Sequence, residues 1–453
     1  MPSRERGHFS FMSYIQGEGR SQGTLFPVVL DDLVPSDHVC RVIDAFVEGL
    51  AMAELGFERA EAADTGRPGY DPRDLLKLYL YGYLHQLRSS RRLEAECRRN
   101  VELMWLLGRL YPDHKSIAEF RRMHREAVTA AGAQLVRFAQ SCGLIRGEWI
   151  AIDGTKFRAV SSADSVRERQ ALERYLDSME QADEEQLAAI DPSAVQVALE
   201  KLKRHREPEA RFMPVARTNA PAYNVQTAVD AEHALIVAHA VTLEAGDNVQ
   251  LQPMAEAAKK ALGAERLQVV ADAGYANGEH AARCEAAGIL PHVPVKRAVN
   301  NQGNGTLFGR EHFRYQPETD TYLCPANKTI RRKQLHRKDK AVVYRADAAD
   351  CGGCAMKTRC TQSSARILTR LLDEDALNRM HQRATPEAMR LRRSTVELPF
   401  AVLKYHIFGN PRLLLRGTGG AQTEISLAIM AYNLKRMIKV LGAVKFTRQL
   451  NPA

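Results

Sequence analysis

The sequence predicts an all-α domain at the N-terminus, followed by a larger mixed α/β domain whose sheet is flanked by helices and which contains a cysteine-rich insertion. Three observations lead to this fold class. No strand pattern interrupts residues 1–145. From residue 148 onward, short apolar runs alternate with amphipathic helical patterns, as in mixed α/β folds. Between residues 300 and 362 this alternation stops, and four of the eight cysteines gather there.

Composition excludes several classes of protein. Of the 453 residues, 45% are hydrophobic and 26% charged, which is typical of a folded chain rather than a disordered or collagen-like one. No apolar run approaches the length of a membrane span, and the N-terminus lacks the apolar core of a secretory signal, so we expect a cytoplasmic protein. The net charge of +10 favours a polyanionic partner, and a merely basic soluble enzyme is an equal alternative.

Helix signals follow one another through residues 1–145, which we predict to be one helical domain. Asp71 is a candidate N-cap, because proline follows it at the first helical position and apolar residues then recur at helical spacing. Ser116 and Glu119 have the spacing of a capping box, which predicts a helix from there to about Gly143.

Arginine is dense on the predicted helices of this domain, beginning at Arg88 and recurring at Arg121. Short helices joined by a Ser-Ser turn can place one helix in a groove of DNA, as helix-turn-helix modules do, and a solvated basic face is the equal alternative. The candidate DNA-binding residues of this domain are Arg91, Arg92, Arg98 and Arg99.

The mixed α/β domain is predicted to span residues 146–453. Residues 162–207 are charged and rich in helix formers but poor in apolar residues, which predicts a helical excursion from the sheet. Strand patterns lie at 149–152, 223–230, 234–237 and 267–271, and helical patterns lie at 249–262, 373–403 and 423–440.

Three carboxylates of this domain stand out by position. Asp153 and Asp272 each end an apolar strand, and side chains at strand ends on one edge of a sheet can converge. Glu397 lies in a helical stretch and shares one helix face with Arg393, because a spacing of four residues returns to the same side. Lys404, seven residues beyond Glu397, would share that face too.

Convergent carboxylates without a Ser, Cys or His nucleophile beside them are suited to holding two Mg²⁺ or Mn²⁺ ions. Two such ions, roughly 3.5–4 Å apart, stabilise the attacking and the leaving oxygens of a phosphodiester displacement. The neighbouring arginine and lysine would then hold the phosphate. The alternative is that each acid is an ordinary turn or cap residue.

The four clustered cysteines are candidates for a structural zinc site. One Cys-x-x-Cys pair with two outlying thiols can supply four ligands, although the spacing is not that of a standard zinc ribbon. The equal alternative is that the four cysteines are reduced, partly buried thiols without a metal. The four are Cys324, Cys351, Cys354 and Cys360. Basic residues of the same insertion are expected to face DNA, namely Arg331, Arg332 and Lys333.

Three motifs resemble those of bacterial insertion-sequence transposases of the DDE class. IDGTKF around Asp153 is similar to the family's first motif, and VVADAGYANGE around Asp272 is similar to the second. RRSTVELPFAVLKYHIFG around Glu397 is similar to the third, in which a tyrosine, an arginine, the glutamate and a lysine are separated by two, three and six residues. Arg393 and Lys404 match the arginine and lysine positions, whereas an arginine stands at the tyrosine position.

The resemblance covers nearly the whole chain. GYDPRDLLKLYLYGYL and DHKSIAEFR resemble the family's N-terminal domain, and AYNLKRM resembles its closing helix. The group typified by insertion sequence family eleven-eighty-two has similar cysteines between the second and third motifs. The resemblance implies an RNase H-like catalytic core in residues 146–453 and DNA binding by residues 1–145.

The resemblance further implies a DNA transposase, a divalent-metal-dependent endonuclease and polynucleotidyl transferase. Two Mg²⁺ or Mn²⁺ ions held by Asp153, Asp272 and Glu397 would serve cleavage at the ends of the element and strand transfer, with Arg393 and Lys404 positioning phosphates.

The implied partners are double-stranded DNA, both the terminal inverted repeats and the target, and further copies of this chain in a synaptic complex. The implied location is the bacterial cytoplasm, at the nucleoid. Two alternatives stay open, an RNase H-like nuclease without strand transfer and a non-catalytic DNA-binding protein derived from a transposase.

Overall fold

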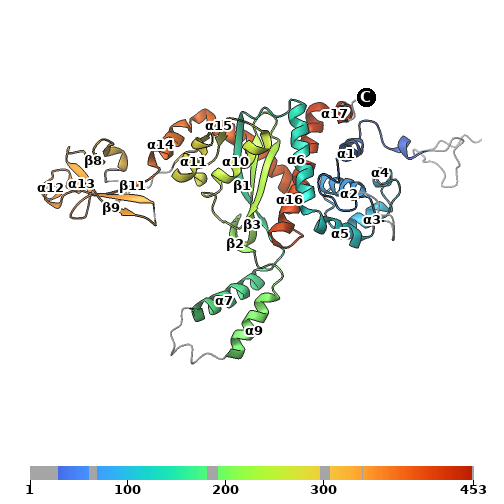
Figure 1. Cartoon of the computed structure of the whole chain (residues 1–453), viewed down its shortest axis with the longest axis horizontal. Helices are drawn as coiled ribbons and strands as arrows, with labels where there is room; N and C mark the ends of the chain where they lie inside the picture. Colours follow the sequence, from blue (N-terminus) through green and yellow to red (C-terminus); the bar gives the residue numbers. More distant parts are fainter. Residues whose placement is uncertain (1–28, 61–68, 181–191, 296–306, 339, 451–453) are drawn as a thin grey trace, which may run out of the picture.

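The computed structural model describes residues 29–60, 69–180, 192–295, 307–338 and 340–450. Helices occupy the N-terminal part and pack beside a central sheet, whereas a helical hairpin and a second sheet project from this body (Figure 1). The architecture confirms the predicted fold class at this level, a helical N-terminal region followed by a mixed α/β core. Within those ranges, no helix combines the length and the apolar character needed to cross a membrane.

The N-terminal helices are short and pack closely together. In chain order they are η1 (Leu30–Leu33), α1 (Val39–Glu48), α2 (Pro72–Leu84), α3 (Ser90–Cys97), α4 (Val101–Leu106), α5 (His114–Met123) and α6 (Arg125–Ser141). Helix α2 is buried on nearly every side, and Asp71 caps it by accepting a hydrogen bond of 2.8 Å from the backbone N–H of Arg73. This confirms the predicted start of the helix, with proline at its first position.

The predicted helix from Ser116 to Gly143 is wrong in its start and in its continuity. Asp113 is the N-cap, three residues before the predicted cap at Ser116, because its carboxylate accepts hydrogen bonds from the N–H groups of Lys115 and Ser116. At His124 the backbone leaves the helical conformation, with φ −100° and ψ 39°. The segment therefore forms two helices, α5 and α6.

Six strands of the described chain form the central sheet: β1 (Trp149–Arg158), β2 (Arg211–Val215), β3 (Thr218–Asp230), β4 (Ile236–Thr242), β5 (Leu267–Val270) and β6 (Ile289–His292). Strand β3 is antiparallel to β1, β2 and β4, and β5 is parallel to both β1 and β6. Across the sheet the order is β2, β3, β1, β5, β6, with β4 also paired to β3, so the first strand lies in the middle.

Helices pack on the sheet from the segments between and after its strands. On one face, Ala388 and Val396 of α15 (Pro386–Ala401) pack against Ala151 of β1 and Val270 of β5. Helices α10 (Leu251–Leu262), α11 (Gly278–Ala286) and α14 (Glu374–Arg383) connect and flank the strands. The helical pattern at 373–403 is divided into α14 and α15 because Thr385 caps a new helix there.

One hydrophobic core runs through the N-terminal helices and the central sheet. Helix α16 (Gly417–Leu441) packs against α6 and α2, and α17 (Ala443–Leu450) packs against α1. Phe138 of α6 stacks on Phe446 of α17 with ring centroids 5.7 Å apart. The predicted boundary near residue 145 falls between α6 and β1, but the packing joins the two parts.

Two arginines that the sequence groups with the basic surface are buried at this junction. Arg88 Nη1 lies 3.2 Å from Oε2 of the fully buried Glu424 on α16. Arg121 donates a hydrogen bond of 3.3 Å to the carbonyl of Arg88 and is also buried. Both arginines therefore stabilise the junction and are not available to DNA.

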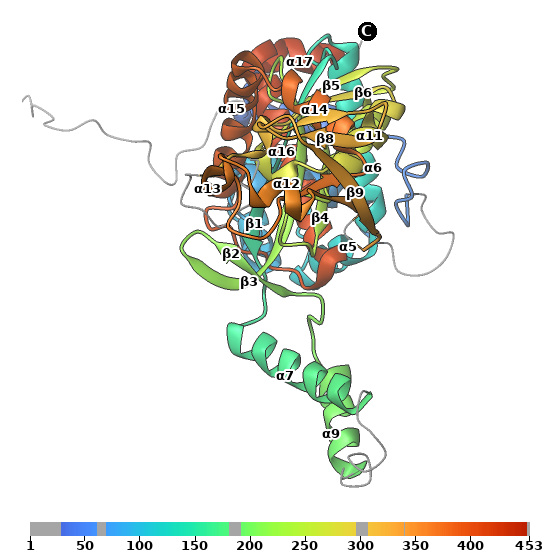
Figure 2. The ribbon, with the colours of Figure 1, turned by 90° about the vertical axis from the view of Figure 1, so that its left-hand side faces the viewer.

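The helical excursion is an antiparallel pair that projects from the end of the central sheet (Figure 2). It comprises α7 (Ala163–Glu180) and α9 (Pro192–Lys203), which contact each other. Both helices lie within the range 162–207 that the sequence predicts to be helical.

The cysteine-rich segment contains a second, antiparallel sheet, for which the sequence analysis predicts no strands. Its order is β11 (Ile367–Leu371), β10 (Ala341–Arg345), β9 (Thr329–His336), β8 (Thr321–Leu323) and β7 (Arg314–Gln316), with η3 (Arg310–His312), α12 (Ala348–Gly352) and α13 (Lys357–Cys360) beside it. The strands are short and β9 is exposed and basic, so the alternation of apolar and polar residues that predicts a strand is weak here. The sheet has its own small core around Ile330 and Leu368, and it continues beyond residue 362 to Leu371.

Candidate active site

Asp153 and Asp272 lie at the same end of two neighbouring strands. Strands β1 and β5 run parallel with Ala151 paired to Val270, and each aspartate follows two residues later. Because side chains alternate between faces, this spacing directs both carboxylates to the face that α15 covers. Asp272 also accepts a hydrogen bond of 2.8 Å from the N–H of Gly274, at the start of the 3-10 turn η2 (Ala273–Tyr275).

One guanidinium group reaches both carboxylates. Arg392 Nη2 lies 2.9 Å from Oδ2 of Asp153 and 3.5 Å from Oδ2 of Asp272. Arg392 stands four residues from both Ala388 and Val396, so it lies on the face of α15 that packs on the sheet. Its Nε is buried without a hydrogen-bond partner among the described residues. A single positive group therefore lies between two carboxylates at the edge of the sheet.

Burial and neighbouring charges shift the pKa of Asp153. Burial, the largest effect, raises this pKa, and the carboxylates of Asp272 and Asp247 raise it further, whereas Arg392 and the N–H of Gly154 lower it. The net shift is upward, as is usual for a buried carboxyl group.

Glu397 and Arg393 lie on the exposed side of α15. Within the described residues, no hydrogen bond or ion pair joins Glu397 to Asp153 or Asp272, and the three carboxylates are not gathered within 4.8 Å. It is Arg392, one residue before Arg393, that contacts the aspartates. The structure thus brings two of the three acids together and leaves the third exposed on the covering helix.

Lys404 lies close to Asp153. Burial lowers the pKa of its half-buried ammonium group. The carboxylate of Asp153 raises this pKa, and the ammonium group of Lys156 lowers it further. Lys404 belongs to η4 (Val402–Ile407), a π-helical turn that directly follows α15. Pro399 is accommodated inside α15, and the helix widens only beyond it.

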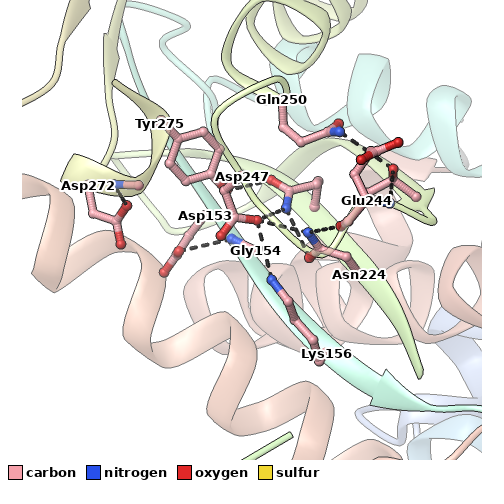
Figure 3. A network of polar contacts seen from close by, with 12 residues as sticks. Asp153, Gly154, Lys156, Asn224, Glu244, Asp247, Gln250, Asp272 and Tyr275 are labelled. Atoms are coloured by element: carbon pink, nitrogen blue, oxygen red, sulfur yellow. Dashed lines mark hydrogen bonds and ion pairs between the residues drawn. The ribbon is translucent and has the colours of Figure 1, made fainter. Parts of the chain in front are cut away.

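A second polar cluster lies behind Asp153 (Figure 3). Asp247 Oδ1 accepts hydrogen bonds from the side-chain amides of Asn224, at 2.8 Å, and Gln226, at 2.7 Å. Lys156 Nζ lies 3.4 Å from the same oxygen, and the buried Tyr275 hydroxyl donates to Gln226 Oε1. The pairing of Gly154 with Gln226 and Lys156 with Asn224 places this cluster on the face of the sheet opposite to the Asp153 side chain.

Gly154 provides the space for this cluster. A Cβ atom on residue 154 would stand 2.2 Å from Gln226 Nε2 and 2.9 Å from Asp247 Oδ1. Both distances are shorter than van der Waals contact, so only glycine permits the amide and the carboxylate to approach β1 this closely. The glycine after Asp153 is therefore part of the site's architecture.

Two family models match the chain over successive segments. Residues 28–123 match a family described as Transposase domain (DUF772), and residues 148–434 match the family described as Transposase DDE domain. The chain belongs to the DDE transposase family. No curated protein sequence matches it. Among solved structures, a cryo-EM structure of a piggyBac transposase synaptic complex with hairpin DNA is similar at a TM-score of 0.37 and 10% identity, over 91% of this chain and 78% of that one.

The protein is thus a DDE-type DNA transposase, as the three motifs imply. Asp153, Asp272 and Glu397 all lie within the range that matches the DDE family, as do Arg393 and Lys404. The assignment of roles to these five residues stays a prediction.

The predicted DNA-binding arginines of the transposase are on its surface. Arg91 and Arg92 on α3 are exposed and form no ion pair with another described residue. Arg98 is exposed and lies 5.9 Å from the ring centroid of Tyr111, whereas Arg99 pairs with Glu96. On β9, Arg331 and Lys333 are exposed, and Arg332 forms an ion pair of 3.0 Å with Asp320. Their contact with DNA stays a prediction.

The four cysteines of the second sheet line one small cavity of about 30 Å³. Burial raises the pKa of Cys360, the guanidinium of Arg366 lowers it, and the other three thiols raise it. The four sulfur atoms do not all lie within 4.8 Å of one another. In the described chain, only His38, Cys40 and Glu102 bring three such ligand atoms that close.

Sequence reasoning missed Arg392, Asp247, Asn224 and Gln226. A signal exists for the last two, because Asn224 and Gln226 alternate with apolar residues in a strand that is otherwise apolar, and both are fully buried. Polar side chains in such a strand need partners, which predicts a buried hydrogen-bond network. No signal identifies Asp247, which lies in a loop between β4 and α10.

Proposed function

We propose that this transposase cleaves DNA at the ends of its element and joins the freed 3′-hydroxyl to target DNA. The observation that supports this most directly is the convergence of Asp153 and Asp272 on one cationic group at the edge of the sheet. An RNase H-like architecture is supported by the strand order, with β1 in the middle, an antiparallel hairpin on one side and parallel strands on the other.

The aspartate pair fits a divalent cation. Two carboxylates converge on Arg392 Nη2, so the geometry already places positive charge between them. Asp153 and Asp272 would hold Mg²⁺ or Mn²⁺, with Glu397 supplied by α15 as the third ligand of a two-ion site. Such ions stabilise charge on the attacking and leaving oxygens of a phosphodiester.

Protein side chains around this pair would position the DNA. Lys404 lies near Asp153, so its ammonium group is placed to contact the scissile phosphate. Arg393 on the exposed side of α15 would contact a neighbouring phosphate. Lys156 forms an ion pair with Asp247 on the other face of β1. This ion pair would hold β1, and with it Asp153, in place.

DNA would also be held outside the catalytic edge. The exposed arginines of α3, in particular Arg91 and Arg92, form a basic surface on the N-terminal helices, and Arg331 and Lys333 form another on β9. We place the helical domain at residues 1–145 and the catalytic domain at 146–453, with the helical excursion at 162–207 and the basic insertion at 300–362. Because two element ends must be joined, we expect several copies of the chain to assemble on DNA at the nucleoid.

Three variants test the proposed reaction. Asp153→Asn, Asp272→Asn and Glu397→Gln each keep the size of the side chain and remove one ligand charge. Each is expected to lower cleavage and joining of element-end DNA, with Mg²⁺ or Mn²⁺, by several orders of magnitude. Binding to the same DNA should persist, because the basic helices are separate from the aspartate pair.

The outcome separates the alternatives. Cleavage without joining by the parent protein would identify a nuclease, and binding without either reaction would identify a DNA-binding protein. Full cleavage by all three variants would show that the carboxylates are not catalytic. If Asp153→Asn and Asp272→Asn lose cleavage but Glu397→Gln keeps it, Glu397 is not part of the catalytic site.

We also propose that the four cysteines of the second sheet hold a structural zinc ion. They come from three separate segments and line one cavity of about 30 Å³, room for a single ion. The N–H of Lys328 donates to Cys324 Sγ at 3.3 Å, which favours a thiolate. The buried Arg366, which also lines the cavity, supplies compensating positive charge. The sheet has a small core, so a metal would add stability that the packing alone provides poorly.

The zinc content of the purified protein tests this proposal. Freshly reduced full-length protein should contain about one zinc per chain by elemental analysis. Cys354→Ser should lower the zinc content and loosen the second sheet, whereas Cys284→Ser, a buried cysteine of the central core, should leave the zinc content unchanged. Reduced protein without zinc would refute the site.

A further inference from the structure

The base of the α7–α9 hairpin encloses a second basic site. A cavity of about 420 Å³ lies there, between α7, the residues that follow β1, the end of α9 and the start of α16. We propose that this cavity binds the phosphate backbone of the DNA on which the transposase acts, an inference that rests on the proposed function.

The cavity contains a buried arginine with unused hydrogen-bond donors. Arg169 is 1% exposed, and its Nη2 donates to the carbonyl of Ala210 at 2.8 Å. Among the described residues, its Nε and Nη1 have no hydrogen-bond partner, and Nε forms a long ion pair of 3.6 Å with Glu173. Burial and the neighbouring Arg211 lower the pKa of Arg169, as expected for a cation short of negative charge. Unsatisfied guanidinium donors at a cavity wall are suited to an anionic oxygen.

Three further cations line the same cavity without a carboxylate partner. Lys201, Arg206 and Arg416 come from α9, the segment after it and the N-cap of α16, and no ion pair joins them to another described residue. The acids nearby are mostly engaged. Glu207 accepts from the N–H of Ser161 and from Tyr223 at 2.7 and 3.0 Å.

The balance of charge at the wall is therefore positive. Arg204 also lines the cavity but pairs with Glu200 at 2.9 Å. Glu168 is the one carboxylate among the lining residues, against the four cations described above. Ser161 and Ser162 add hydroxyl donors to the same wall. The one aromatic ring in the lining, the imidazole of His205, is engaged with Ser165 at 2.8 Å. Positive charge with hydroxyl donors matches a phosphodiester.

The position of the cavity relative to the aspartate pair fits one bound duplex. Asp153 lies inside β1, which ends at Arg158, and the chain reaches the cavity at residues 160–162. At about 3.3 Å per extended residue, this stretch spans at most roughly 23–30 Å. One turn of duplex DNA spans about 34 Å. A duplex whose backbone meets the aspartates can therefore reach the hairpin base within one turn.

Paired variants of the full chain test the cavity. Lys201→Ala with Arg206→Ala removes two lining cations, and Arg174→Ala with Lys203→Ala removes two exposed cations of the same helices that lie outside the cavity. The assay is binding to a labelled DNA duplex of mixed sequence over a series of salt concentrations. The cavity variant should reduce the slope of log affinity against log salt by about 1.8, because two phosphate contacts are lost. The control pair should keep the parent slope.

A conservative pair distinguishes charge from packing. Lys201→Arg with Arg206→Lys keeps both charges and should keep the parent slope, with all variants checked for an unchanged unfolding temperature. Equal slopes for the cavity and control pairs, or a reduced slope in the conservative pair, would overturn the cavity proposal while DNA binding itself stands. A parent protein that binds no DNA would overturn the proposed function instead.

Discussion

Gly154→Ala should disturb the polar cluster behind Asp153 at a cost that the structure allows us to work out. The added Cβ would lie 2.2 Å from Gln226 Nε2, so the buried amide must move. That movement breaks its hydrogen bonds to Asp247, at 2.7 Å, and from Tyr275. Each leaves a buried polar group unpaired at about 1–3 kcal/mol, so we expect a loss of roughly 2–5 kcal/mol in the free energy of unfolding.

The effect can be measured by urea unfolding. The two tryptophans, Trp149 at the start of β1 and Trp105 on α4, provide the fluorescence that follows unfolding. Gly352→Ala is the matched control, because a Cβ there meets nothing within 4 Å, and it should change the unfolding free energy by less than about 0.5 kcal/mol. In a Gln226→Ala background, Gly154→Ala should cost much less, because the displaced amide is already absent.

Two results would refute this reasoning. One is an unfolding midpoint for Gly154→Ala equal to that of the parent. The other is an equal loss with and without Gln226, which would show that the cost arises elsewhere in β1.

Two further predictions concern the N-terminal helices. Glu424→Ala should destabilise the protein by about 3–5 kcal/mol in thermal or urea unfolding, because Arg88 is left buried without its carboxylate partner. Glu424→Gln should cost less stability. Equal losses for the two variants would show that the charge of Glu424 does not cause the effect. Burial raises the pKa of Asp74 to about 6 from 3.8, so the folded state holds this proton more tightly than the unfolded state, and the carboxyl costs stability as the pH rises through that interval. Asp74→Asn should therefore be as stable as the parent near pH 3.8 and more stable than the parent above about pH 6. An equal difference in stability at these two pH values would contradict the raised pKa of Asp74.

Much of the fold is predictable from local patterns. The cap at Asp71 and the strands before Asp153 and Asp272 are visible because they depend on neighbouring residues. The start of α5 is not visible, since Asp113 and Ser116 are both acceptable N-caps and the local pattern does not choose between them. The second sheet is hidden because its strands are short and β9 is exposed and basic.

The site is predictable only in part, for a similar reason. Asp153 and Asp272 follow paired residues of parallel strands, so their proximity can be inferred once the strands are recognised. The choice between Arg392 and Arg393 depends on how α15 is rotated on the sheet, and a shift of one residue turns a side chain by 100°. That rotation is set by Val396 packing on β1 and β5, a contact between segments more than a hundred residues apart.

The contact of α16 with α2 and α6 has a consequence for synthesis. The helices made first bury their apolar surface against a helix made among the last, with the Arg88–Glu424 pair joining residues 336 positions apart. A ribosome must therefore release nearly the whole polypeptide before the N-terminal core can close, and contacts of such long range are slow to form. Interrupted products that end before residue 417 would lack this partner and be exposed to proteolysis.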